Sequence, residues 1–268
     1  MAYSFDAAVS SSPNGPSNTT RQHFRANYMD QVLAAYEPFF KRNIDASVIH
    51  LAHDELSRYK LVVIPALYLM DEGSAHAVRS YVNHGGTVLM TGYSAKLNGN
   101  GQWHDSALPG GLSDVFGLRT AAFYRTDEGV VYCFQNQHVR SSAKYFEQLE
   151  PRGAVVLGEI TNADARGHFP ALTFNTFGEG QAYYLATEST SDALAPVLEW
   201  VANAAGVTQG LSTPDGVYAR VVDQRVYHVN TTASEAQIPI EGKRRGLLSG
   251  QNFRDVLVLP PRHAELLE

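Results

Sequence analysis

Hydrophobic residues along the first two hundred positions follow the patterns of alternating strands and helices. Continuous apolar runs at 61–65 and 87–91 are typical of strands buried on both faces of a parallel sheet. Shorter apolar runs at 2–5 and 47–51 predict two further strands near the start of the chain. Apolar side chains at helical spacing predict three helices, over residues 24–40, 71–84 and 192–205.

The order strand, helix, strand predicts right-handed crossovers between parallel strands. We therefore expect an α/β domain with a doubly wound, mostly parallel sheet. A long loop rich in Gly and Asn covers residues 98–111. Later runs are also rich in strand-forming residues, at 129–134, 154–160, 171–174 and 178–187.

The pattern changes after Gly206. Residues 209–216 resemble a linker, and the remaining chain holds short alternating runs with turn residues between them. Such runs are typical of a small antiparallel β-sandwich, with strands expected at 217–222, 225–230, 236–240 and 253–259. The sequence thus predicts two domains, an α/β domain over 1–208 and a small antiparallel β domain over 209–268.

Composition and charge exclude several classes of function. The 268 residues have a formal net charge of −6, so no basic excess is available to neutralise nucleic-acid phosphates. A single cysteine, Cys133, forbids an intrachain disulfide and a thiolate-rich zinc site. Apolar runs are too short to cross a bilayer, and no secretory signal is visible at the N-terminus. We expect a cytoplasmic protein with no membrane or nucleic-acid partner, no metal and no cofactor.

Three segments resemble the trimerisation domain of glycoside hydrolase family 42 β-galactosidases. They are Tyr-Lys-Leu-Val-Val-Ile-Pro-Ala-Leu-Tyr-Leu-Met at 59–70, Tyr-Val-Asn-His-Gly-Gly-Thr-Val-Leu at 81–89 and Phe-Gly-Glu-Gly-Gln-Ala-Tyr-Tyr at 177–184. The resemblance implies a flavodoxin-like sheet related to class I glutamine amidotransferases, followed by a small antiparallel domain. It also implies a homo-oligomer, with a trimer favoured.

In that family the catalytic carboxylates lie on a TIM barrel that precedes the trimerisation domain, and nothing in these residues corresponds to it. Our first hypothesis is a stand-alone homologue of the trimerisation and C-terminal domains. It would act in assembly, with itself or a partner glycoside hydrolase, or in recognition of galactosides. Because the first expected strand, at 2–5, lies at the very start of the chain, a fragment of a longer enzyme is the alternative.

The amidotransferase relation suggests a nucleophile on a sharp turn after a central strand. Residues Gly92, Tyr93 and Ser94 form half of a G-x-S-x-G elbow, but Lys96 stands in place of the closing glycine. Ser94 is therefore a candidate nucleophile, with an ordinary loop hydroxyl as the alternative.

Two carboxylates are needed for most glycoside hydrolysis, and ligand crevices lie at the carboxyl ends of parallel strands. Asp6 and Glu188 follow expected strands and have no capping role assigned by spacing, whereas Asp71 and Glu72 open a helix. Our second hypothesis is a compact, β-galactosidase-like glycoside hydrolase that uses Asp6 and Glu188.

Aromatic side chains suit stacking on sugar rings and burial at subunit interfaces alike. The candidates near the expected ligand side are Tyr68, Tyr93, Trp103 and Tyr124, with His104 beside them in the long loop. They predict either a substrate-binding surface, which includes a sugar-binding module without chemistry, or contacts with a neighbouring subunit.

Overall fold

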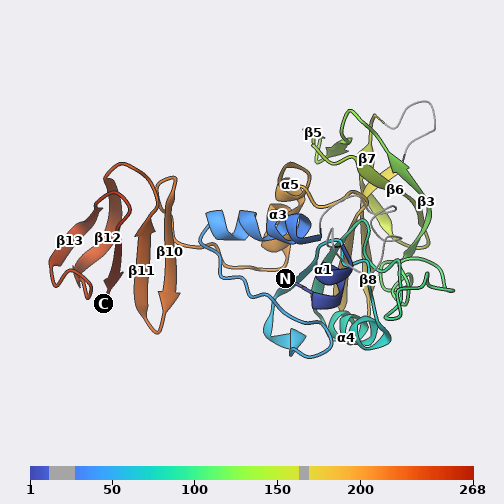
Figure 1. The fold of residues 1–268 in the computed structure, drawn as a ribbon, viewed down its shortest axis with the longest axis horizontal. Coiled ribbons are helices and arrows are strands. Elements are labelled where there is room, and N and C mark those ends of the chain that lie inside the picture. The colour runs from blue at the N-terminus through green and yellow to red at the C-terminus, as the bar shows by residue number, and fades with distance from the viewer. Residues whose placement is uncertain (12–27, 163–168) are drawn as a thin grey trace. The chain divides into compact units, whose positions relative to one another are not determined.

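The computed structural model describes residues 1–11, 28–162 and 169–268 (Figure 1). They form two compact units. Unit 1 comprises Met1–Tyr36 and Ser47–Val207, and unit 2 comprises Glu37–Ala46 and Thr208–Glu268. The short segment 37–46 therefore packs with the C-terminal strands, although it lies near the start of the chain.

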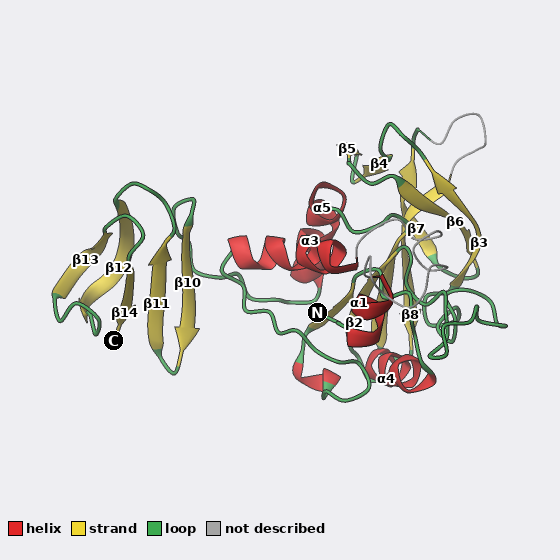
Figure 2. Cartoon of the chain, in the orientation of Figure 1, coloured by secondary structure: helices red, strands yellow, loops and turns green. Residues whose placement is uncertain are grey.

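Within the described part of unit 1, seven strands form one sheet in the order β1-β2-β9-β8-β7-β4-β5. Their bounds are β1 Leu61–Ile64, β2 Thr87–Thr91, β4 Val131–Phe134, β5 Gln137–Arg140, β7 Val155–Ile160, β8 Phe169–Phe177 and β9 Gly180–Leu185. Figure 2 shows these strands with the helices of unit 1 around them. β2 is buried along its whole length, so both of its faces are covered.

The expectation of a mostly parallel sheet is wrong, because the sheet is mixed. Only the pairs β1–β2 and β2–β9 are parallel. The other four neighbouring pairs, from β9 outward to β5, are antiparallel. The tight turn at Gly178 joins β8 directly to β9, and a connection this short permits only antiparallel pairing.

The predicted helix between the first two buried strands is present as α4 (Glu72–Asn83). Asp71 is its N-cap, and the Asp71 side chain accepts a hydrogen bond of 2.6 Å from Ser74 N. The third predicted helix is α5 (Ser191–Ala204). The first is α3 (Tyr28–Lys41), and the predicted residues 24–27 lie outside the described residues.

The strand expected at 2–5 is wrong. Ala2 makes a single bridge with Ile49, and the helix α1 (Phe5–Ser11) begins directly afterwards. The Ser4 hydroxyl accepts a hydrogen bond of 3.3 Å from Ala7 N, which is the contact of a helix N-cap and favours helix over strand here. The strand expected at 47–51 is likewise reduced to the bridge at Ile49.

Two strands that the sequence did not predict, β3 (Leu118–Arg125) and β6 (Tyr145–Pro151), form an antiparallel pair. Phe146 bridges Thr187, and Glu147 N donates to Ala186 O at 2.9 Å. These contacts hold the β3–β6 pair against the residues that follow β9. The pair therefore covers the carboxyl ends of the parallel strands.

The strands of unit 2 pair in antiparallel fashion. β10 (Val217–Val222), β11 (Arg225–Asn230) and β14 (Ala264–Leu267) form one sheet, and β12 (Ala236–Arg245) pairs with β13 (Asn252–Leu259). Its buried core consists of Val217, Ala236, Ile238, Leu257, Leu259 and Leu267. None of the helices in the described ranges combines the length and apolar character needed to cross a bilayer.

Candidate functional site

The chain turns sharply after β2, at the carboxyl ends of the parallel strands. Tyr93 has a φ of 72°, a conformation that non-glycine residues rarely adopt. A Cβ at Gly92 would lie 2.9 Å from both the Ala186 and the Thr187 carbonyl oxygens. Glycine is required there because the chain after β9 passes directly against the turn.

Ser94, the candidate nucleophile, is wholly buried. Its hydroxyl accepts a hydrogen bond of 3.1 Å from Leu67 N and donates one of 3.3 Å to Ile64 O. Both partners are main-chain groups around the end of β1, and neither is a general base of the kind that activates a serine. This geometry supports the reading of Ser94 as a structural hydroxyl.

The centre of the site is an ion pair between Lys96 and Glu147. Lys96 Nζ lies 2.8 Å from Glu147 Oε2, and both side chains are fully buried. The carboxylate accepts five hydrogen bonds, at Oε1 from Tyr93 N (2.8 Å) and Tyr145 OH (2.9 Å), and at Oε2 from Lys96 Nζ (2.8 Å), Tyr184 OH (2.8 Å) and Thr120 Oγ1 (2.9 Å). We call Lys96, Glu147, Thr120, Tyr145 and Tyr184 the Lys96–Glu147 cluster.

Burial lowers the pKa of Lys96, and the Glu147 carboxylate acts in the opposite direction. Burial also raises the pKa values of Tyr145 and Tyr184 well above the ordinary range, and the charge of Glu147 raises them further. Both phenols therefore remain protonated donors at neutral pH. The cluster is a closed network in which the carboxylate and the ammonium are paired within the protein.

A column of aromatic rings leads from this cluster to the surface. Tyr93 stacks on Tyr145 at 3.7 Å between centroids, Tyr145 on Phe123 at 6.2 Å, and Phe123 lies 5.9 Å from Trp103. The inner two rings are buried, whereas Phe123 is 40% and Trp103 44% exposed. Lys96 Nζ lies 5.5 Å from the Phe123 ring centroid. We call Trp103 and Phe123 the aromatic rim.

The remaining aromatic candidates have different surroundings. Tyr68 is buried, and its hydroxyl donates to the Ala7 carbonyl. Tyr124 OH donates to Gln148 Oε1 at 3.0 Å. Burial lowers the pKa of His104, whose ring packs so closely on Gly110 that a Cβ there would lie 2.0 Å from it.

Asp6 and Glu188, the candidate carboxylates, lie in unlike environments. Asp6 is exposed in the first turn of α1. Glu188 is buried, and its Oε1 accepts a hydrogen bond of 2.5 Å from Lys144 N. Glu188 N donates to Tyr145 O at 3.4 Å, and the Tyr145 ring stacks on Tyr93. Burial raises the pKa of Tyr93, and the charge of Glu188 raises it further.

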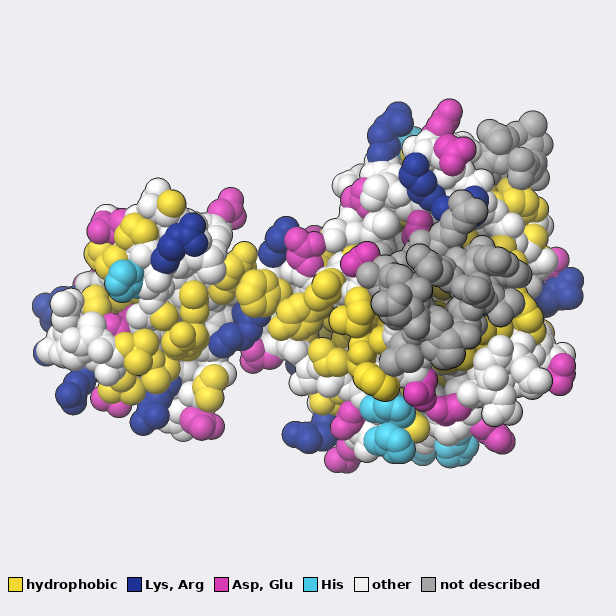
Figure 3. Space-filling view, in the orientation of Figure 1, with side chains coloured by type: hydrophobic (Ala, Val, Ile, Leu, Met, Phe, Trp, Pro, Cys, Tyr) yellow, Lys and Arg dark blue, Asp and Glu magenta, His cyan; other side chains and the backbone are white. Residues whose placement is uncertain are grey.

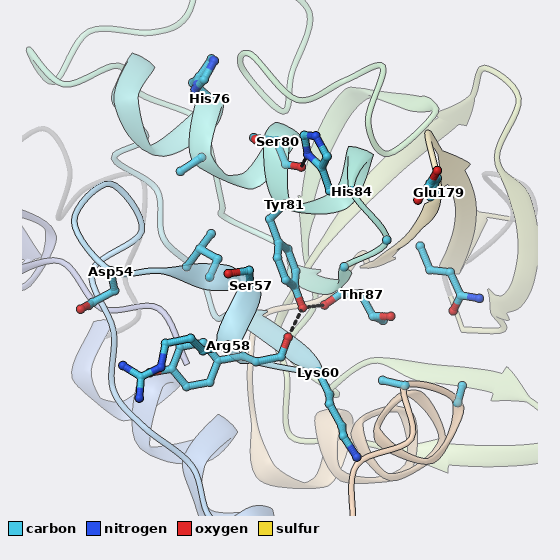
Figure 4. Close-up of a pocket in the computed structure, with 18 residues that line it drawn as sticks. Asp54, Ser57, Arg58, Lys60, His76, Ser80, Tyr81, His84, Thr87 and Glu179 are labelled. Carbon is cyan, nitrogen blue, oxygen red and sulfur yellow. Dashed lines mark hydrogen bonds between the residues drawn. The ribbon is translucent and has the colours of Figure 1, made fainter.

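A polar pocket of about 800 Å³ lies at the opposite edge of the sheet, at the amino ends of β1, β2 and β9 (Figure 4). The Tyr81 side chain, from α4, lines this pocket. Its hydroxyl donates to Tyr59 O at 2.8 Å and to Thr87 O at 3.2 Å. Its charged lining has both signs, from Asp54, Arg58, Lys60 and Glu179. No candidate residue expected from the sequence lies in this pocket, because ligand crevices of parallel sheets are expected at the carboxyl ends of the strands.

Sequence reasoning also missed Glu147, Thr120, Tyr145 and Tyr184. The signal that could have found Glu147 is its place in the run Tyr-Phe-Glu-Gln-Leu, where a charged residue interrupts a largely apolar strand. In the sequence, Lys96 stands out only because it occupies the position of the closing glycine of an elbow motif. Its partner lies 51 residues away along the chain and belongs to an unpredicted strand.

Several known proteins are similar to this chain in sequence or in fold. Residues 4–208 match the family model of the beta-galactosidase trimerisation domain. Beta-galactosidase BgaA of Planococcus sp. (strain 'SOS Orange') is 30% identical over 240 residues, which are 86% of this chain and 34% of the relative. The beta-galactosidase crystal structure from Bacillus circulans sp. alkalophilus has a TM-score of 0.85 at 27% identity, over 99% of this chain and 40% of that one. The chain spans about a third of the length of the curated relatives BgaA and BgaP, and it belongs to the beta-galactosidase trimerisation domain family.

Proposed function

We propose that this chain is a non-catalytic assembly domain that associates with further copies of itself, with a trimer favoured, in the context of β-galactoside metabolism. The observation that carries the proposal is the Lys96–Glu147 cluster. It occupies the carboxyl ends of the parallel strands, where the nucleophile was expected, and all five donors to Glu147 come from the protein itself. A carboxylate coordinated in this way holds elements together and has no lone pair directed at a substrate.

The flavodoxin-like, class I amidotransferase-like relation is part of this proposal. Three features support it, namely the parallel order β1-β2-β9, the crossover helix α4 and the tight turn at Gly92. In this interpretation the elbow of an enzyme ancestor has lost its nucleophile, and Tyr93 occupies the strained position.

The aromatic rim is the surface that we assign to assembly. Exposed aromatic side chains are the usual anchors of protein interfaces, and the outer ring pair is supported from below by Tyr145 and Tyr93. β3, the strand that holds Phe123, also holds Arg119. Arg119 Nε lies 2.5 Å from Glu150 Oε2 in an exposed ion pair. An apolar centre with charged groups beside it is the composition of a specific interface.

Sedimentation velocity of the purified chain over a wide concentration range tests the proposal. We expect a species of three times the 29.3 kDa chain mass that dissociates on dilution. A chain that stays monomeric at every concentration would contradict assembly. Association with a separate glycoside hydrolase is then tested by mixing the two proteins before sedimentation.

Sugar recognition is a second candidate, favoured by the exposed faces of Trp103 and Phe123 and by the nearby His104. Titration with methyl β-D-galactopyranoside, followed by calorimetry, tests it. Hydrolysis is tested in parallel with aryl β-galactosides, and the variants are Asp6→Asn, Ser94→Ala and Glu188→Gln. We expect no turnover that co-purifies with the chain, and turnover abolished by these variants would overturn the non-catalytic proposal.

A further inference from the structure

A second cavity, of about 710 Å³, lies entirely within unit 2. All of its lining residues fall between positions 211 and 267, beyond the residues 4–208 that match the trimerisation family. A function of this cavity therefore goes beyond the proposed assembly role and does not depend on it. Its volume is within the range of small-molecule sites.

β12 is irregular where it borders the cavity. The pairing of β12 with β13 shifts register between Pro239 and Lys243, and Gly242 within this bulge has a φ of 67°. A bulge bends a strand away from its partner sheet. The opening reaches the core of unit 2, since Ile238 and Leu267 belong both to the core and to the cavity wall.

The lining of the cavity combines apolar side chains with one buried imidazole. Val226, Ile238 and Leu267 supply apolar walls. His228, also part of the lining, is only 4% exposed, and its Nδ1 has no hydrogen-bond partner among the residues that the structure describes. Burial lowers the pKa of His228, so the imidazole is neutral at pH 7 and adds a hydrogen-bonding group without a charge.

The mouth of the cavity carries Gln224, Glu241 and Arg244, all of them exposed. In the described parts of the chain, these three side chains make no hydrogen bond or ion pair. One carboxylate and one guanidinium give a mouth with no net charge. An amide, a carboxylate and a guanidinium together offer several donors and acceptors to hydroxyl groups.

We propose that this cavity binds a small uncharged amphiphile of the alkyl- or aryl-glycoside class. Its apolar body lies against Val226, Ile238 and Leu267, and its hydroxylated head pairs with groups at the mouth. The balance of charges at the mouth disfavours ions of either sign, and the apolar wall disfavours a free sugar. Surface hydrophobic atoms spread over the face of unit 2 seen in Figure 3, and the cavity combines apolar walls with a buried imidazole in its lining.

Methyl-resolved NMR of the full chain tests the proposal with three probes. These are phenyl β-D-glucopyranoside, which has body and head, benzyl alcohol, which has mainly the body, and methyl β-D-glucopyranoside, which has only the head. We expect saturable shifts of the Val226, Ile238 and Leu267 methyl groups, with the phenyl glucoside at least about tenfold tighter than either other probe. Saturation at other methyl groups, no saturation, or equal affinity for benzyl alcohol would overturn the proposal.

Substitutions test separately the contacts of the ligand's apolar body and those of its hydroxylated head. Ile240→Arg places a long charged side chain in the bulge and is expected to weaken phenyl glucoside binding about tenfold or more. Val258→Arg is the matched control, since Val258 is 40% exposed on the paired strand and lies outside the lining. Preserved amide shifts in β13 and β14 show that unit 2 remains folded.

A second substitution keeps the test independent of folding at the bulge. Arg244→Gln changes an exposed residue of the mouth, and it is expected to weaken the phenyl glucoside several-fold without changing benzyl alcohol affinity. Unchanged affinity in both Ile240→Arg and Arg244→Gln would overturn the assignment. Sedimentation of the same samples reports assembly separately, so failure of one proposal is distinguishable from failure of the other.

Discussion

Lys96 Nζ lies 2.8 Å from Glu147 Oε2, and neither side chain has any exposed surface. Lys96 follows the sharp turn after β2, whereas Glu147 lies on β6. The pair therefore fastens the β3–β6 strands to the carboxyl ends of the parallel strands. A buried ion pair adds little over an apolar pair of equal volume, but removing one partner leaves a charge without compensation.

The first prediction concerns this pair. Lys96→Met is expected to lower the free energy of unfolding by about 3–5 kcal/mol, because it removes the cation that faces the buried Glu147 carboxyl group. Lys96→Met combined with Glu147→Leu is expected to recover part of that loss, and urea denaturation measures both. The control is Arg119→Met, which breaks the exposed pair with Glu150 and is expected to cost under about 1 kcal/mol. Equal losses for Lys96→Met and Arg119→Met would contradict the role assigned to the buried pair.

Because the Tyr81 phenol is buried, we expect the free energy of unfolding to fall at alkaline pH. Burial raises the pKa of Tyr81 from 10.0 to about 12. The stabilisation from keeping this phenol protonated is complete below pH 10 and is lost as the pH rises from 10 to 12, because the unfolded state loses its proton first. We expect Tyr81 to contribute about 2 kcal/mol to the fall in unfolding free energy over that window.

Denaturation of the wild type and Tyr81→Phe at pH 9 and pH 12 measures this contribution. Tyr81→Phe loses the bonds to Tyr59 O and Thr87 O, and is thus less stable at pH 9 but falls less on the way to pH 12. Tyr227→Phe, at a 39% exposed position of unit 2, is the control. An identical fall in the wild type and Tyr81→Phe would show that Tyr81 is not the group involved.

The turn at Gly92 predicts a steric penalty. Gly92→Ala places a Cβ 2.9 Å from two main-chain oxygens, so the backbone has to shift, at a cost of about 1–3 kcal/mol. Gly73→Ala in α4 is the matched control, because the nearest atom there is 3.4 Å away and alanine favours the helix. Thermal unfolding compares the two variants, and a Gly92→Ala protein as stable as Gly73→Ala would refute the close approach.

The Asn43 side chain holds part of unit 2 together, and we expect its removal to weaken that unit locally. Its Nδ2 donates to Leu211 O at 2.7 Å and to Thr213 Oγ1 at 2.8 Å, and its Oδ1 accepts from Ala219 N at 2.8 Å. Asn43→Ala removes these bonds and leaves a buried amide without an acceptor, so we expect a loss of about 3 kcal/mol in unit 2. Hydrogen exchange at Ala219 measures it.

The control for Asn43 is Asn100→Ala, at an exposed loop position. We expect exchange at Ala219 to accelerate only in Asn43→Ala. Equal protection in both variants would mean that segment 37–46 does not stabilise the C-terminal strands.

The aromatic rim predicts a loss of assembly without a loss of fold. Trp103→Ala with Phe123→Ala is expected to weaken self-association about tenfold or more, since aromatic anchors carry much of the binding energy of an interface. Val221→Ala with Val222→Ala is the control, because these exposed valines lie outside the matched family region. Sedimentation equilibrium measures both double variants. Weakening by the valine pair alone would move the interface to unit 2.

Local patterns along the chain determined several elements by themselves. The continuous apolar runs produced β1 and β2, and Asp71 followed by helical spacing produced α4. The run at 59–70 also carried the family resemblance. These features depend on burial and on capping within a few residues, which is why the sequence alone was sufficient.

Only the tertiary structure decided the mixed order of the sheet, the β3–β6 cover and the two pairings that organise the units. Lys96 meets Glu147 across 51 positions, and Asn43 meets Ala219 across 176. An alternating run predicts a strand but not its neighbour or its direction, and a lone charged residue in such a run does not name its partner. Those choices are made by long-range packing, because the cost of burying a charge is offset only when the folded chain brings its counterpart within hydrogen-bonding distance.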